Sequence, residues 1–173
     1  MSEPEHLSKL QEGVDAWNAW RNEFSQIIPD LSGADFAEMN LARINFGACY
    51  LADVDLRGAN LQHANLIGAE MANANLERAE CSFALLRFAD ISHANFANAN
   101  LEQANLTEAD ARHANFTDAN LRMAFFTKAY LANANFTRAN LASAALVDAD
   151  LTDAILDGAN LEAAIMPDGS INE

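Results

Sequence analysis

Histidine and carboxylate side chains are the residues of this chain best suited to bind a metal ion. His93 and His113 lie 20 residues apart, Asp90 and Asp110 precede them at the same spacing, and Asp53 lies further upstream. Imidazole and carboxylate groups are common ligands of Zn²⁺. These groups could form a site only if the chain returned to the same place every 20 residues. The alternative is an exposed pair of histidines without a ligand.

Catalytic signatures are absent from the sequence. It contains no Gly-rich phosphate loop, no HExxH motif and no paired CxxC motif. We therefore expect no catalytic residue, no cofactor and no resident metal, and we do not expect the chain to be an enzyme.

The strongest pattern in the chain is a period of five residues. One apolar residue, nearly always Leu or Phe, recurs at every fifth position from Leu31 to Met166, which gives 28 sites without a break in register. The residue two positions before each site is alanine at every step from Ala59 to Ala164. This period excludes an α-helix, because about 100° per residue would scatter the sites over every face. It predicts short extended sides joined by corners and stacked about 4.8 Å apart in a solenoid.

The repeated units, such as Ala59-Asn60-Leu61 and Ala139-Asn140-Leu141, resemble the pentapeptide-repeat family over residues 31–166. This resemblance implies an all-β solenoid, a right-handed quadrilateral parallel β-helix in which four units form one coil. The 28 units then give about seven coils. The alanine and the central Leu or Phe of each unit are expected to point inward, and the other three residues outward.

Four units per coil place residues that are 20 apart on top of one another. Phe96, Phe116 and Phe136 should therefore stack in successive coils, and Phe126 should face Phe116 across the core. Ala111 is the only alanine among the central sites. It either makes room for these rings or reflects drift to a smaller residue.

Cysteine usage and the chain start favour a cytoplasmic location. Cys49 and Cys81 occupy inward positions on opposite sides of the coil, so we expect buried reduced thiols and no disulfide. Residues 1–6 are acidic and lack the basic start and apolar run of a signal peptide. No segment approaches 18 apolar residues, so we expect no membrane-spanning helix.

Residues 1–30 lack the five-residue period and form the first predicted domain. Their apolar residues recur close to helical spacing, with Ser2 and Pro4 as a helix start and Pro29 as a stop. Residues 17–21 resemble a helix often found before these repeats. We predict an α-helix that caps the first coil, and a partner-binding helix is the alternative.

The repeat domain is predicted over residues 31–166, and a short polar tail over residues 167–173. No helical pattern follows the repeats, so the last coil is expected to be uncapped. Such an end would allow an end-to-end homodimer.

The chain is strongly acidic. Its net charge is −15, and residues 34–168 carry 18 acidic and 8 basic residues, a net of −10. Direct binding to nucleic acid or to an anionic membrane is therefore disfavoured. One side of the predicted coil carries six carboxylates against Arg112 alone. These form the candidate acidic face: Asp53, Glu70, Asp90, Asp110, Asp150 and Asp153.

A neighbouring side carries apolar residues at outward positions where the repeat normally places polar ones. Such a patch favours a protein contact, and the alternative is scattered apolar residues without a partner. These residues form the candidate apolar face: Ile67, Leu85, Phe125, Val147 and Ile165.

Two functions remain open on the sequence. The first is a non-enzymatic protein-interaction or scaffold module whose partner is unknown. The second is implied by the resemblance, because some members of the family imitate duplex DNA and bind DNA gyrase or topoisomerase. A duplex carries about 20 charges over the roughly 34 Å that seven coils would span. The coils carry a net charge of only −10, so the first function is preferred.

Overall fold

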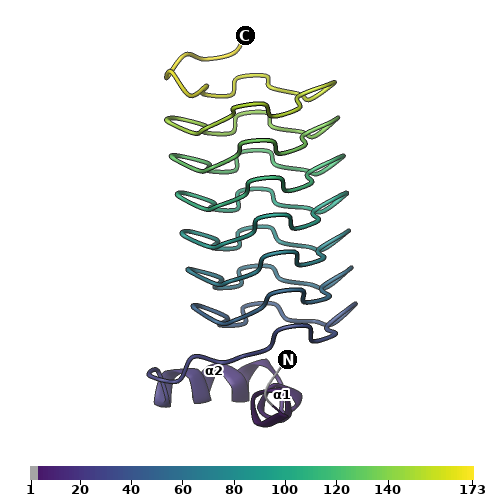
Figure 1. The fold of residues 1–173 in the computed structure, drawn as a ribbon, viewed down its shortest axis with the longest axis vertical. Coiled ribbons are helices and arrows are strands. Elements are labelled where there is room, and N and C mark those ends of the chain that lie inside the picture. Colours follow the sequence, from purple (N-terminus) through teal and green to yellow (C-terminus); the bar gives the residue numbers. More distant parts are fainter. Residues whose placement is uncertain (1–3) are drawn as a thin grey trace.

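The computed structural model describes residues 4–173 and shows two short helices below a stack of coils (Figure 1). Helix α1 spans Pro4–Gln11 and helix α2 spans Val14–Glu23. The two helices lie across the N-terminal end of the stack, and the C-terminus lies at the opposite end.

Parallel backbone bridges join residues that are 20 apart, from Asp30↔Tyr50 to Ala145↔Ile165. Because each unit has five residues, every coil has four sides. The predicted 20-residue register is therefore confirmed.

Each side of the coil is shorter than the extended strand that the sequence suggested. Within residues 4–173 the parallel pairing takes the form of single-residue bridges separated by two-residue turns. From Leu31 to Leu161, the residue two positions after each central site has a positive φ, for example 60° at Glu38 and 55° at Asp153. This left-handed conformation turns the chain through a corner, so one residue per side is left to pair with its neighbours.

The core contains the alanine and central positions, as predicted, except in the last coil, where Leu151, Leu156, Leu161 and Met166 are only partly buried. Phe116 stacks on Phe96 and Phe136 with ring centroids 5.2 and 5.0 Å apart. Phe126 meets Phe116 edge-on at 6.1 Å. The predicted aromatic ladder and its partner across the core are confirmed, and these four rings are fully buried.

Ala111 supplies a test of the core. It is fully buried, and the residues one coil before and after it are the larger Ile91 and Leu131. Replacing Ala111 with Phe should overpack this layer and lower the free energy of unfolding by about 1–3 kcal/mol. Urea denaturation measures the effect, with Ala111→Ser as the small control. An unchanged midpoint for the Phe variant would contradict the inward placement.

The N-terminal region differs from the single predicted helix. Gly13, with a φ of 103°, separates α1 from α2, because this backbone conformation ends a helix. Helix α2 ends at Glu23 and not at Pro29, and Phe24, one of the apolar residues at near-helical spacing, is 42% exposed. The predicted helix start at Ser2 lies outside the described residues.

Helix α2 supplies hydrogen bonds that the first coil would otherwise lack. The Trp17 indole Nε1–H donates to the Asn45 carbonyl at 2.7 Å. The Asn45 N–H in turn donates to the Asn18 Oδ1 at 2.8 Å. The Arg21 guanidinium donates to the Gly47 carbonyl at 2.7 Å.

Inside the stack, the equivalent carbonyls accept backbone N–H groups from the preceding coil. The Asn65 carbonyl, for example, accepts the Phe46 N–H at 2.8 Å. Side chains of α2 therefore take the place of a missing coil on this side. Unpaired backbone groups at the buried edge of the first coil would be costly, because they have no water to bind. The side chains of Trp17, Asn18 and Arg21 avoid this cost.

The tail pairs with the last coil, although the sequence suggested that nothing covers this end. Ile171 forms an antiparallel bridge with Ile165, and further backbone hydrogen bonds from residues 170–172 hold the tail in place. On two other sides the end stays open, because the backbone N–H groups of Leu151 and Leu156 have no protein partner within the described chain.

Candidate functional site

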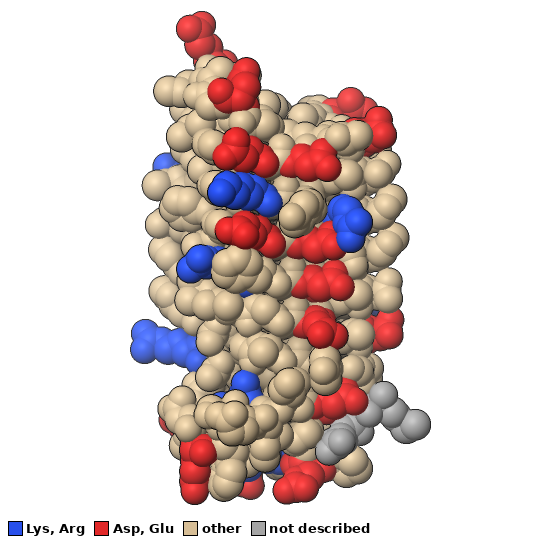
Figure 2. All heavy atoms as spheres, turned by 60° about the vertical axis from the view of Figure 1, so that its left-hand side comes forward, with Lys and Arg blue, Asp and Glu red and all other residues tan. Residues whose placement is uncertain are grey.

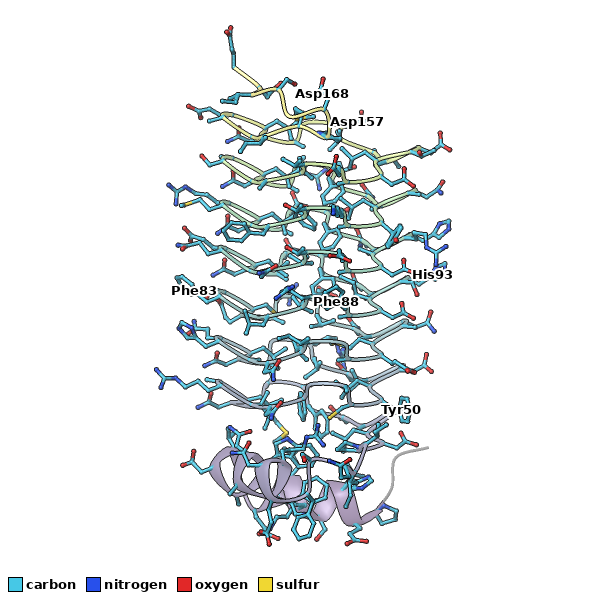
Figure 3. The ribbon with its side chains drawn as sticks, turned by 90° about the vertical axis from the view of Figure 1, so that its left-hand side faces the viewer. Tyr50, Phe83, Phe88, His93, Asp157 and Asp168 are labelled. Carbon is cyan, nitrogen blue, oxygen red and sulfur yellow. The ribbon has the colours of Figure 1, made fainter. Side chains whose placement is uncertain are left out.

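The candidate apolar face lies on one side of the solenoid. In Figure 3 this side is on the left, between the labels of Phe83 and Phe88. The bridges Leu85↔Asn105 and Asn105↔Phe125 place Leu85 and Phe125 in one column, two coils apart. Leu85 is 40% exposed and Phe125 is 47% exposed. The other predicted members of the face are half-buried: Ile67, Val147 and Ile165.

Leu85 and Phe125 replace an asparagine that normally stabilises its corner. Asn95 is typical, because its Oδ1 accepts the N–H two residues further along at 3.2 Å and a side-chain amide one coil later at 3.0 Å. Leucine and phenylalanine cannot accept either bond. The N–H groups of Arg87 and Thr127 accordingly have no protein partner in the part of the chain that is described. The apolar face therefore costs the fold local hydrogen bonds.

Three exposed residues that the sequence analysis missed extend the apolar face. Phe83, Phe88 and Met123 occupy corners with φ values of 60°, 59° and 58°. Each lies two residues after a central site, at an outward position of the five-residue register, and an apolar residue at such a position is the signal that could have identified them. The Phe83 ring stacks on His63 at 4.9 Å, and the Arg87 guanidinium lies 5.0 Å from the centre of the Phe88 ring.

The acidic face is built mainly from one column of carboxylates. The bridges Glu70↔Asp90 and Asp90↔Asp110 stack three of them in successive coils, and Asp150 follows after Tyr130. Figure 2 shows this column as acidic side chains that succeed one another along the axis. The structure therefore brings together four of the six predicted residues.

The other two predicted residues, Asp53 and Asp153, lie on the neighbouring corner column and are 100 residues apart. They sit near opposite ends of the stack and do not form a site with one another. Asp30 extends the main column by bridging to Tyr50, which the sequence analysis did not include.

Two carboxylates of this face have lowered pKa values. The Arg112 guanidinium donates to both carboxylate oxygens of Asp110 and lowers its pKa. The Thr152 side chain and backbone N–H lower the pKa of Asp150 in the same way. Both groups therefore stay ionised under neutral conditions.

Acid should remove this stabilisation. A carboxyl whose pKa is depressed in the folded state stabilises the fold above its unfolded pKa of about 4, and this is lost as the pH falls through the folded value. We expect the double variant Asp110→Asn/Asp150→Asn to lose less stability than the parent as the pH drops below about 4. Urea midpoints across that range measure the difference. Parallel pH profiles would contradict the assignment.

The residues considered for metal binding do not form a site. The His93 and His113 rings stack in parallel at 4.7 Å, but no group of three or more His, Cys, Asp or Glu residues within residues 4–173 could hold a metal ion. Burial raises the pKa of both Cys49 and Cys81 to about 12, which keeps the thiols protonated.

Comparison with family models identifies the repeats. The model for pentapeptide repeats matches in eight copies, over residues 30–66, 55–87, 84–122 and 144–168. These segments cover more than half of the chain. None of the described helices is long and apolar enough to cross a membrane.

The fold is similar to that of solved structures of one resistance protein, and lower scores are found for two pentapeptide-repeat proteins. The trypsin-treated form of QnrB1, a plasmid-mediated fluoroquinolone resistance protein, superposes with a TM-score of 0.75 at 23% identity, over 80% of this chain and 70% of that one. A protein of the Arabidopsis thaliana thylakoid lumen gives 0.45 at 32% identity, over 58% of this chain and 66% of that one. HetL of Nostoc sp. strain PCC 7120, involved in heterocyst differentiation regulation, gives 0.32 at 28%, over 83% and 87%. No curated protein matches the chain significantly in sequence.

Proposed function

Because the chain belongs to the pentapeptide-repeat family, we propose that it is a non-enzymatic protein-interaction module whose partner binds the apolar face. The scaffold in this proposal is a right-handed, four-sided β-helix of about seven coils, closed at its N-terminal end by α1 and α2. We propose a cytoplasmic location, in keeping with the two buried thiols.

A single observation carries the proposal. Leu85 and Phe125 are 40% and 47% exposed, and each replaces an asparagine whose hydrogen bonds support the corner. Neither side chain belongs to the buried core, so the core packing does not require an apolar residue at either position. A partner that buries the exposed part of one such side chain could gain about 1 kcal/mol.

The partner should be lost when the apolar face is made acidic. We expect the variant Leu85→Asp/Phe125→Asp to fold like the parent, because both residues are at the surface. A pull-down from the soluble extract of the native host should then recover proteins with the parent that the variant does not retain. The matched control is Ile155→Asp, which changes a residue of similar exposure, 45%, on the opposite side of the coil. If the parent and the double variant recover the same proteins, at matched unfolding midpoints, the partner does not bind the apolar face.

Self-association through the C-terminal end is part of the proposal. The open N–H groups of Leu151 and Leu156 could pair with a second copy and form an end-to-end homodimer. Sedimentation velocity of the parent and of a variant with proline at both positions separates this contact from binding at the apolar face.

The alternative function is imitation of duplex DNA toward DNA gyrase or topoisomerase. The column from Glu70 to Asp150 favours it, because the carboxylates repeat at the spacing of the coils, about 4.8 Å. The fold likeness to QnrB1, a fluoroquinolone resistance protein, is the reason to test it. Inhibition of supercoiling by purified gyrase that Glu70→Gln/Asp90→Asn abolishes would favour this function over the first.

A further inference from the structure

The apolar face adjoins unpaired carboxylates at the corner occupied by Phe88. In Figure 3 this corner faces the viewer, between Phe83 on one side and His93 on the other. Glu108 lies one coil after Phe88 in the same column, and Asp90 lies two residues after it. Glu70 bridges to Asp90 one coil earlier. Phe88 is therefore bordered by three carboxylates.

These three carboxylates lack the ion pair that Asp110 forms with Arg112. None of them has an ion-pair partner among the described residues. The basic groups close to the corner are Arg87, over the Phe88 ring at 5.0 Å, Lys128, and Arg112, which pairs with Asp110 and also interacts electrostatically with Asp90. Three unpaired carboxylates beside an aromatic ring that already holds a guanidinium attract further cations.

The spacing of the apolar residues discriminates between an extended and a helical partner. Leu85 and Phe125 lie two coils apart in one column, a rise of about 9.6 Å along the axis. Residues on one face of a strand recur at about 7 and 14 Å, and neither value fits. Residues seven apart on an α-helix are separated by about 10.5 Å, which matches.

From this charge and spacing we propose that the partner presents a basic amphipathic α-helix. The helix lies along the solenoid axis over Phe88, its apolar residues contact Leu85 and Phe125, and its Lys or Arg residues contact Glu70, Asp90 and Glu108. This inference rests on the proposed function and specifies the chemistry of the partner.

A synthetic peptide tests the proposal on the full chain. The probe is a fluorescent peptide of about 18 residues, with Leu residues seven apart and a neighbouring stripe of Lys. The control peptides have the same composition in scrambled order, or Glu in place of Lys. We expect the striped peptide to bind about tenfold more tightly than either control, to become helical on binding, and to weaken with added salt.

Matched variants identify the surface that the peptide uses. Glu70→Gln/Asp90→Asn/Glu108→Gln should weaken binding about tenfold and flatten its salt dependence. The control triple variant Asp35→Asn/Glu77→Gln/Asp157→Asn removes the same net charge from the opposite side and should bind like the parent. The variant Leu85→Asn/Phe125→Asn puts the usual asparagine of the repeat at both positions. It should weaken binding of the peptide, although the net charge of the protein is unchanged.

Several outcomes would overturn the proposal. They are equal binding of the striped and scrambled peptides, binding without helix formation, or equal loss in the two triple variants. If the peptide fails but Leu85→Asp/Phe125→Asp still loses its partner from the extract, the interaction module stands and only the basic helix is wrong. If the triple variant still binds the peptide like the parent and Leu85→Asp/Phe125→Asp still recovers the partner from the extract, the proposed function fails as well.

Discussion

Replacing Trp17 with alanine is expected to lower the free energy of unfolding by about 3–5 kcal/mol. The indole is fully buried, meets Phe46 edge-on at 5.7 Å, and donates to the Asn45 carbonyl at 2.7 Å. Its loss leaves a cavity between α2 and the first coil and an unpaired carbonyl at the edge of the stack. Urea denaturation followed by far-UV circular dichroism measures the effect.

Two further variants separate packing from hydrogen bonding in the cap. Trp17→Phe keeps a ring but removes the Nε1–H donor, so it should cost about 1–3 kcal/mol. Trp20→Ala should cost less than Trp17→Ala, because Trp20 is only partly buried. If Trp17→Ala unfolds at the same urea midpoint as the parent, α2 does not cap the coils. That result would favour the alternative prediction, a partner-binding helix.

Replacing Phe116 with alanine is expected to cost a similar amount, about 3–5 kcal/mol. Its ring stacks on Phe96 and Phe136 and also meets Phe126, so the substitution empties the centre of the aromatic ladder. A solenoid stacks each coil only on its neighbours, and a gap in the middle weakens the contact on both sides.

The control for Phe116 is leucine, which the chain uses at most other central positions. Phe116→Leu keeps much of the buried volume and should cost clearly less than Phe116→Ala. Equal losses for the two variants would show that ring stacking, and not filled volume, decides the stability of this layer. A loss below about 1 kcal/mol for alanine would contradict close packing there.

The core could be predicted from the sequence because every inward position must satisfy the same geometry. The 20-residue register and the stack of Phe96, Phe116 and Phe136 follow from the five-residue period together with the four units per coil that the family resemblance implies. The single bridge per side did not follow, because the period does not state how many residues the corner needs. The positive φ at each corner supplies that answer.

The candidate site was harder to predict, because outward residues contribute little to the fold and obey no period. Leu85 and Phe125 stood out only as departures from asparagine. Phe83 and Phe88 were missed because corner positions vary widely in residue type, and their unusual backbone conformation is visible only in the structure. The break at Gly13 was overlooked because the apolar spacing continues across it.

The most direct test of the account is a binding titration with the partner recovered by the pull-down. Parent, Leu85→Asn/Phe125→Asn and Ile155→Asn should be titrated by calorimetry, with their unfolding midpoints measured on the same samples. The account predicts stability at least equal to that of the parent for Leu85→Asn/Phe125→Asn, because the asparagines can remake the corner hydrogen bonds. It also predicts a loss of about tenfold or more in affinity for this double variant alone. Equal affinity of the double variant and the parent, at equal stability, would contradict the claim that the apolar face is the site of function.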